Sequence, residues 1–597
     1  MMKCACIMFS LWLVLVASIS PVIPVPVSPI DLYTADQCQM CLGTVKLLQD
    51  ATDSKATLAD LEPVLIESCS LILSRMEMKG KVLCPGLVAA YGPVIQFVFS
   101  KRVIDPTAVC ATVHMCSDDS VNITDDHLIV LQKWIDKMLP DDGSHDQPDP
   151  DVLDKHTQLP CSSSYKPVVK NEHQKITSDG TNNTFLKILQ ISDLHVDRLY
   201  KEVGCQICGA LQLIVGYLYV VEQEKNSVEQ SGFAGKYGDY NCDIPLITVD
   251  LLISEIKTME PQPDIILYIG DNPPHDVWME TWNGQLQASE YLVDYFSEQL
   301  PDTTIYPVFG NHESYPQSQY YADLYMNLTF NMSEIWKDWF DVSSEQQETI
   351  GIGGYYTTLL NSKLRLVSLN TDYGYALNFY TMLNGQNIYY HKYIKWIYDT
   401  LDEAESRGEK VLLAGHIPPG DTTSLPELGQ LYLNITKTYQ NTIVAVLAGH
   451  THFDQFELVQ DKDGVYGVVL VSPSVTTFSH VNPSYRVYTM DPVTFQLLDY
   501  DQYYLDLTEA NKSPHVIPTW KKSYSAREEY GLDDLTPNSW AGLVKRFYKD
   551  KTMVLKYQQN LQVQSINVTK CDKECIREVI CSTTNCNSLN YYLCRDI

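Results

Sequence analysis

Five short motifs, each following an apolar run, constrain the fold of this chain more than any other feature. The runs are FLKILQIS, DIILYIG, TIYPVFG, KVLLAG and TIVAVLAG, which are typical of short buried strands. The motifs that follow them are DLH at 193–195, GDNPPHD at 270–276, GNHE at 310–313, GHIPPG at 415–420 and GHTH at 449–452. Because ligands bind at the carboxyl ends of strands in open α/β sheets, we expect these motifs to form one site.

The motifs consist of residues that bind divalent metal ions. Asp supplies charge, His supplies nitrogen ligands, and Asn binds without adding charge. His450 and His452 are two residues apart, so on an extended backbone both side chains face the same way. The glycines before Asp271, Asn311, His416 and His450 are expected to allow tight turns at the strand ends. Four His and two carboxylates suit zinc, although manganese and iron are also compatible with these ligands.

The order of the motifs resembles that of the calcineurin-like dinuclear metallophosphoesterases. Within that group, GDNPPHDVW, GNHES, GHIPPG and GHTHFDQFEL are similar to the acid sphingomyelinase family, as are NPSYRVY (482–488) and AREEYGL (526–532). The resemblance implies one metal ion held by Asp193, His195 and His452, a second held by Asn311, His416 and His450, and Asp271 bridging the two. Pro274 stands where purple acid phosphatases carry a tyrosine ligand, and GDNPPHD lacks the phosphate-binding arginine of serine/threonine phosphatases.

This resemblance implies a phosphodiesterase that hydrolyses sphingomyelin to ceramide and phosphocholine through a hydroxide activated by two zinc ions per chain. The ceramide alkoxide needs a proton to leave, and His312 is the first candidate for the general acid, with His275 the second. Glu313 is expected to orient a neighbouring histidine. Two alternatives remain open: a secreted phosphodiesterase for nucleotides or other soluble diesters, and a non-catalytic lipid-binding protein.

A cysteine-framed segment at residues 34–120 resembles an all-α saposin B-type domain. Six cysteines allow 15 pairings, and the family pairing implies Cys38–Cys116, Cys41–Cys110 and Cys69–Cys84. Between the first and last of these cysteines, seven cations balance seven anions, whereas the chain as a whole carries −31. We therefore expect this segment to approach anionic lipid surfaces and to present sphingomyelin from membranes or lipoproteins.

Several features predict export. Residues 1–20 have the layout of a signal peptide, with Lys3 before an apolar run. Seven N-glycosylation sequons begin at Asn122, Asn182, Asn327, Asn331, Asn434, Asn511 and Asn567. We expect a glycoprotein that is secreted, lysosomal or both. The net charge of −31 argues against nucleic-acid binding, which needs a basic face.

The chain is predicted to continue with a linker at 121–182, an α/β metallophosphoesterase domain at 183–500 (a mixed β-sandwich flanked by helices), and a helical, disulfide-linked segment at 501–597. Family spacing implies Cys571–Cys575 and Cys581–Cys594, which leaves Cys586 unpaired. The pairing among Cys161, Cys205, Cys208 and Cys242 stays open.

Overall fold

The structure is a computed structural model that describes residues 66, 80–101, 185–200, 234–566, 568, 570–584, 586–588 and 594. The predicted signal peptide, the linker and most of the saposin-type segment lie outside these residues. Within the described part of the chain, no helix combines the length and apolarity that crossing a bilayer requires.

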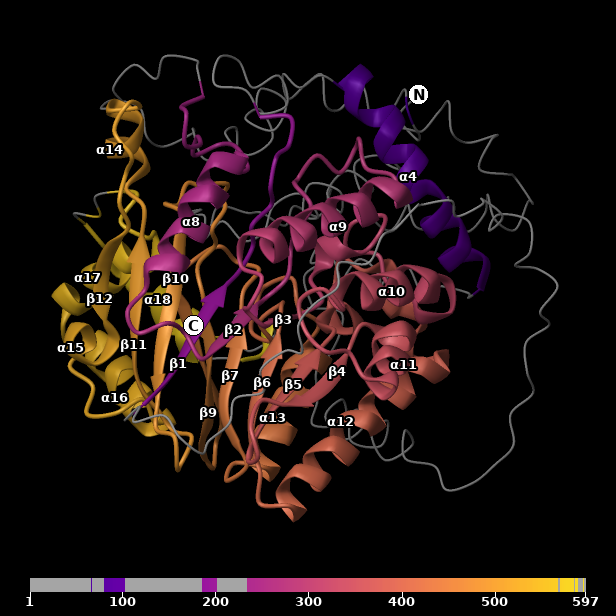
Figure 1. Cartoon of the computed structure of the whole chain (residues 1–597). Helices are drawn as coiled ribbons and strands as arrows, with labels where there is room; N and C mark the ends of the chain where they lie inside the picture. The colour runs from indigo at the N-terminus through magenta and orange to yellow at the C-terminus, as the bar shows by residue number, and fades with distance from the viewer. Residues whose placement is uncertain are drawn as a thin grey trace. The chain divides into compact units, whose positions relative to one another are not determined.

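A first mixed sheet contains six strands in the order β12-β11-β10-β1-β2-β3 (Figure 1). Its strands are β1 (Leu186–Ile191), β2 (Ile265–Tyr268), β3 (Ile305–Pro307), β10 (Ser484–Met490), β11 (Leu497–Tyr504) and β12 (Lys521–Ser525). Strands β1, β2 and β3 are parallel to one another. Strand β10 pairs antiparallel with β1, and β11 and β12 continue the sheet in antiparallel pairs. The carboxyl ends of β1, β2 and β3 therefore lie at one edge of the sheet.

A second mixed sheet has the order β4-β5-β6-β7-β9-β8. Its strands are β4 (Tyr356–Leu359), β5 (Leu364–Leu369), β6 (Lys410–Gly415), β7 (Ile443–Ala448), β8 (Gln455–Asp461) and β9 (Gly464–Val471). The four inner strands are parallel, and β4 and β8 are antiparallel edges. All six residues of β5 are buried, as expected for a strand covered on both faces.

Helices accompany both sheets. Those that follow the strands of the α/β body are α8 (Leu246–Thr258), α9 (Trp282–Gln299), α10 (Ala322–Trp336), α11 (Ser344–Gly353), α12 (Ile388–Ser406) and α13 (Pro426–Thr438). Asn387 caps α12 by accepting hydrogen bonds from the N–H groups of Tyr389 and Tyr390. Gly408, two residues after the last residue of this helix, has φ +62°, a conformation that glycine adopts readily.

The segment after residue 500 is only partly helical. It contains α14 (Leu507–Lys512), α15 (Ala526–Tyr530), α16 (Pro537–Phe547), α17 (Lys551–Leu561) and α18 (Lys573–Thr584). In Figure 1, α15–α18 gather in yellow beside β11 and β12. The prediction of a helical segment missed β12, because its sequence KKSYS is short and only Tyr524 is buried. The predicted disulfides Cys571–Cys575 and Cys581–Cys594 are present, and Cys586 is free and buried.

A buried ion pair ties this segment to the sheets. Arg486 of β10 lies 2.6 Å from Asp454 and 2.8 Å from Oε1 of Gln502 on β11. Tyr524 of β12 donates to the other carboxylate oxygen of Asp454, and the guanidinium stacks 4.2 Å from the ring centre of Tyr500. We call these five residues the Arg486 cluster. It joins three strands of the first sheet to the residue just before β8.

The helix α4 (Gly80–Lys101) is the described part of the predicted saposin-type segment. Its Cys84 is disulfide-bonded, as is Cys242. Cys69, the predicted partner of Cys84, lies outside the described residues, as do Cys38, Cys41, Cys110 and Cys116. The aromatic ring of Phe97 packs edge-on against Tyr321 and Tyr380, at 6.0 and 5.8 Å between ring centres. This helix therefore contacts the α/β body directly.

Candidate metal centre

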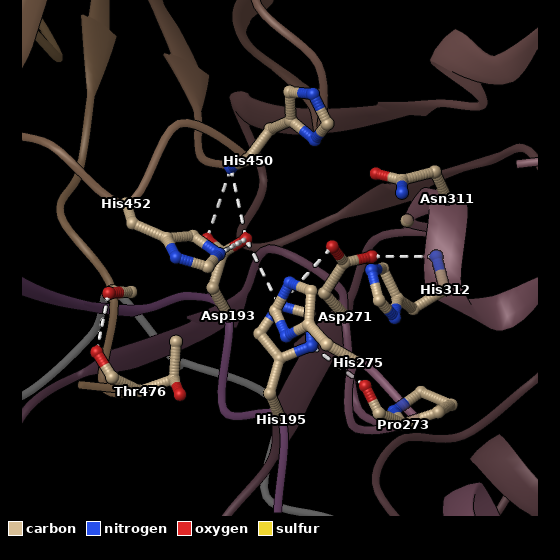
Figure 2. Close-up of polar contacts among 12 residues, drawn as sticks. Asp193, His195, Asp271, Pro273, His275, Asn311, His312, His450, His452 and Thr476 are labelled. Atoms are coloured by element: carbon tan, nitrogen blue, oxygen red, sulfur yellow. Dashed lines mark hydrogen bonds and ion pairs between the residues drawn. The ribbon is translucent and has the colours of Figure 1, made fainter. Parts of the chain in front are cut away.

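All seven predicted metal ligands and both candidate acids follow strand ends and are buried. Five strands contribute: Asp193 and His195 follow β1, Asp271 and His275 follow β2, Asn311 and His312 follow β3, His416 follows β6, and His450 and His452 follow β7. Figure 2 shows most of these side chains pointing toward one another. Parallel strands from both sheets thus deliver their end residues to one place, as the motif pattern predicted.

The backbone at these positions is unusual. Asp193, His195, Asp271, His450 and His452 all have positive φ, between 43° and 71°. Such a conformation is costly for residues with a Cβ atom and occurs mainly at functional sites. The prediction that preceding glycines make the turns holds for Gly270, with φ +84°. Gly310 is needed for space instead, because a Cβ there would lie 2.3 Å from Oδ1 of Asp271.

Two carboxylates lie at the middle of the cluster. Oδ1 of Asp193 is 3.6, 3.8 and 3.9 Å from the Nε2 atoms of His452, His416 and His195, respectively. Oδ2 of Asp271 is 3.0 Å from Nε2 of His416 and 3.5 Å from Nε2 of His195. Asp271 therefore lies between a histidine of each predicted ligand set, the position that a bridging carboxylate needs.

Three of the histidines are oriented by a contact between their Nδ1 atom and a backbone carbonyl. Nδ1 of His195 contacts the carbonyl of Pro273 at 2.7 Å, Nδ1 of His416 contacts that of Ile269 at 2.5 Å, and Nδ1 of His452 contacts that of Phe478 at 3.1 Å. A carbonyl accepts a proton only from Nδ1–H, so the Nε2 lone pairs face the centre. Those Nε2 atoms, both nitrogens of His450 and Oδ1 of Asn311 are buried without a hydrogen-bond partner. This donor set fits divalent cations.

The buried carboxylates also favour positive charge at this site. Burial alone would lower the pKa of His195, but Asp193 and Asp271 raise it to about 9. Burial also acts to lower the pKa of His416, but the same two carboxylates raise it to about 10. The two carboxylates thus favour positive charge at the centre of the cluster. Cations bound between these groups would supply that charge and leave the imidazoles neutral.

Three subgroups have ligand atoms within 4.8 Å of one another. Asp271, His416 and His450 form one of them, and all three were predicted to hold or bridge the second ion. His195 and His452 group with His275, and His195 and Asp271 group with His312. Both candidate acids therefore lie on the His195 side of the centre, where the rings of His195 and His275 are 4.1 Å apart.

Two protein families match the chain in sequence. The calcineurin-like phosphoesterase family matches residues 186–454, and the acid sphingomyelin phosphodiesterase C-terminal region matches residues 465–596. Sphingomyelin phosphodiesterase A of Dictyostelium discoideum is 31% identical over 93% of this chain and 90% of its own length. The chain belongs to the sphingomyelin phosphodiesterase family.

Two human relatives in or near this family align over a shorter region. Human sphingomyelin phosphodiesterase is 33% identical over 61% of this chain and 59% of its own length. Human cyclic GMP-AMP phosphodiesterase SMPDL3A is 29% identical over 60% of this chain and 82% of its own length. The resemblance to the calcineurin-like metallophosphoesterases seen in the motifs is confirmed by the family match over residues 186–454.

The motifs did not reveal Asp243. Its Oδ1 lies 2.9 Å from Nδ1 of His275 and 3.0 Å from Oγ1 of Thr476, and its Oδ2 accepts from the backbone N–H of His275 at 2.7 Å. Asp243 thereby fixes the His275 ring and leaves Nε2 facing the centre. It stands in the segment NCDIPL, which has no metal-motif pattern and is close to His275 only after folding.

Glu313 has a different role from the one predicted. Instead of a histidine, its carboxylate accepts hydrogen bonds from the backbone N–H groups of Gly310, Asp271 and Asn272, at 2.7, 2.9 and 2.7 Å. It therefore ties the turn after β3 to the turn after β2. Burial, followed by the charge of Asp271, raises the pKa of Glu313 to about 7.

The described sequons lie on helices. Asn327 and Asn331 are on α10, and Asn434 is on α13. The Asn327 side chain is exposed, which suits a glycan. Asn511 on α14 accepts from the N–H of Tyr237 at 3.1 Å and donates to the carbonyl of Gly238 at 3.0 Å. Asn122, Asn182 and Asn567 lie outside the described residues.

Proposed function

We propose that this protein is a zinc-dependent phosphodiesterase that hydrolyses sphingomyelin to ceramide and phosphocholine. The observation that carries the proposal is the set of inward Nε2 lone pairs around Asp193 and Asp271, combined with membership of the sphingomyelin phosphodiesterase family. Two divalent cations at such a centre would polarise the phosphate and acidify a water molecule. Asp193, His195 and His452 would hold one, Asn311, His416 and His450 the other, with Asp271 between them.

Zinc is the proposed metal because imidazole nitrogens dominate the inward donors. The carbonyls behind His195, His416 and His452 keep those nitrogens aimed at the ions. Metal analysis of the purified protein is expected to give about two zinc ions per chain. A preparation that is active with a different metal and without zinc would contradict this part of the proposal.

In the reaction, a bond forms from a water oxygen to phosphorus while the bond from phosphorus to the ceramide oxygen breaks. The ceramide oxygen takes a proton from His312 or His275, and the proton lost by water leaves to solvent. Burial lowers the pKa of both imidazoles well below the usual value. The negative charge of a bound phosphate would act in the opposite direction and favour the protonated imidazole. Since the acid must be protonated, activity should rise as the pH falls.

Product analysis with choline-labelled sphingomyelin tests the proposal. We expect phosphocholine to be released, faster at pH 5 than at pH 7, and the release to stop when a chelator removes the metal and to resume when zinc is returned. Release of free choline would place the cleavage on the other side of phosphorus and contradict the proposed bond. Lack of any zinc-dependent release would contradict the enzymatic function.

A second substrate class is favoured by one observation. The human cyclic GMP-AMP phosphodiesterase aligns with this chain over 82% of its own length. Soluble phosphodiesters would use the same metal pair and need no lipid-presenting segment. Sphingomyelin and a cyclic dinucleotide should be compared in one assay by kcat/KM. A higher value for the dinucleotide would make the soluble diester the preferred substrate.

We further propose that residues 34–120 form a saposin-type domain that presents the lipid, and that the protein is an exported glycoprotein of the lysosome or the extracellular space. Support comes from the cysteine spacing, the neutral charge of that segment, the sequons and the apolar run after Lys3. The full chain should hydrolyse sphingomyelin in anionic vesicles faster than in neutral ones. Equal rates on both would argue against contact with anionic lipid.

Enzymatic deglycosylation of protein from the culture medium should lower its mass.

A further inference from the structure

The segment between η3 (Asn311–Glu313) and α10 places a glutamine against the first candidate acid. Gln317 is 1% exposed, and its carboxamide contacts Nε2 of His312. The other ring nitrogen, Nδ1, is buried and has no hydrogen-bond partner. The backbone N–H of His312 donates to Oδ1 of Asp271 at 2.9 Å. The rings of His195 and His275 pack edge-on against His312, at 4.4 and 4.6 Å between ring centres. Gln317 supplies the hydrogen-bonding contact of the ring itself.

We propose that Gln317 is a positioning residue for His312: by hydrogen-bonding Nε2 it fixes the imidazole so that Nδ1 is presented to the leaving-group oxygen. This inference rests on the proposed function, in which His312 supplies the proton. Nothing in the motif pattern distinguishes Gln317 from the polar residues around it.

A carboxamide suits this task better than any apolar side chain of the same size. Its oxygen can accept from an Nε2–H, and its NH₂ group can donate to an Nε2 lone pair, so it can hold the ring before and after proton transfer. In the structure the NH₂ group faces His312. A half-turn of the amide presents the oxygen instead, with little change in shape. Leucine fills similar space but offers neither group.

The backbone around Gln317 is itself fixed. Its carbonyl accepts from the Tyr91 hydroxyl of α4 at 3.2 Å. On the other side, the N–H of Ser318 donates to the carbonyl of Asn311 at 2.8 Å. One contact comes from the N-terminal helix and the other from a predicted metal ligand. The glutamine therefore starts from a rigid position, which a positioning residue requires.

Gln319 provides a matched control two residues away. It is also fully buried, and its carboxamide donates to the carbonyl of Leu377 at 2.7 Å and accepts from the N–H of Phe379 at 3.0 Å. Replacing either glutamine by leucine removes a buried carboxamide from the same segment. Only Gln317→Leu removes a contact with His312.

The test compares leaving groups. The ceramide of sphingomyelin leaves as an alkoxide and needs a proton. The nitrophenyl group of p-nitrophenyl phosphocholine leaves as a stable phenolate and does not. Gln317→Leu should lower kcat for sphingomyelin about 10- to 100-fold, leave KM unchanged, and hardly affect the nitrophenyl ester. Gln319→Leu should affect both substrates alike. Gln317→Glu keeps an acceptor for Nε2–H and should recover part of the lost rate.

Equal loss on both substrates for Gln317→Leu, or no loss on either, would overturn the inference. So would a loss for Gln319→Leu that is confined to sphingomyelin. Thermal unfolding of each variant shows whether it is folded, and the glutamate variant replaces the leucine variant if that one is not. If the unaltered protein cleaves only soluble diesters, the proposed substrate fails, and the same comparison is made with soluble alkyl and nitrophenyl diesters.

Discussion

The metal centre and the Arg486 cluster are both buried, and both join residues far apart in the sequence, but their charges are balanced in different ways. In the Arg486 cluster a guanidinium meets the carboxylate of Asp454 at 2.6 Å, and tyrosine and glutamine supply further contacts. In the metal centre, the described ion-pair partners of Asp193 and Asp271 are histidines alone. One cluster is neutralised by the protein, and the other requires protons or cations.

This difference separates stability from activity. A buried ion pair with one partner removed leaves an uncompensated charge, which is strongly destabilising. A cluster with free lone pairs and positive φ values contributes little to stability and is kept for binding. Substitutions in the Arg486 cluster should therefore act on folding, and substitutions in the metal centre should act on catalysis.

The largest expected effect is in the metal centre. Asp271→Asn removes the carboxylate between His195 and His416 and should lower kcat/KM for sphingomyelin about 10³-fold, the upper end for loss of one electrostatic group. The zinc content of the purified variant should fall as well. The measurement pairs steady-state kinetics with metal analysis. A variant that keeps both its zinc and its rate would show that Asp271 does not bridge the ions.

The next effect is on stability. Arg486→Met leaves the Asp454 carboxylate buried without its cation and should lower the free energy of unfolding by about 3 kcal/mol. Activity per folded molecule should be retained, because the cluster lies outside the metal centre. Urea unfolding and specific activity measure the two quantities. Adding Asp454→Leu to Arg486→Met should restore part of the stability. A variant of normal stability would mean that the pair is not needed for folding.

A smaller effect is expected at the edge of the metal centre. Asp243→Asn keeps the shape of the side chain but removes the charge that holds Nδ1–H of His275, and should lower kcat about 10- to 100-fold. Thr476→Val, which removes only the third contact of Asp243, is the control and should have less effect. The ratio of the two kcat values is the measurement. Similar values for both variants would indicate that the contact with His275 carries no function.

The strands that lead into the metal centre could be predicted from the sequence, because their apolar runs end directly at ligand residues. The runs before Asp193, Asp271 and His450 are β1, β2 and β7. The partners that orient the site could not be predicted in this way. Asp243, Glu313 and Gln317 act through hydrogen bonds across separate loops, and these depend on the path of each loop rather than on spacing in the sequence. The β12 strand was missed because it has one buried residue.

The smallest expected effect concerns a buried group outside both clusters. Burial raises the pKa of the Cys586 thiol to about 12, since the thiolate is poorly solvated there. Between pH 7 and 9 the thiol therefore stays protonated, and its reactive form increases only as the pH rises toward 12. Iodoacetamide at pH 8 should leave Cys586 unmodified in the native protein and alkylate it after unfolding. Rapid alkylation of the native protein would show that the thiol is accessible. Cys586→Ser should hardly change activity.

The late position of β12 has a consequence for synthesis. Until residues 521–525 have been made, β11 is the outer strand of the first sheet, and its backbone N–H and C=O groups on that side have no neighbour. A nascent chain that stops before this point also lacks the Tyr524 contact with Asp454. Such a chain presents an open edge to chaperones and to other nascent chains. Premature stop codons between the end of β11 at Tyr504 and the start of β12 at Lys521 should thus yield retained or aggregated protein instead of a shortened enzyme.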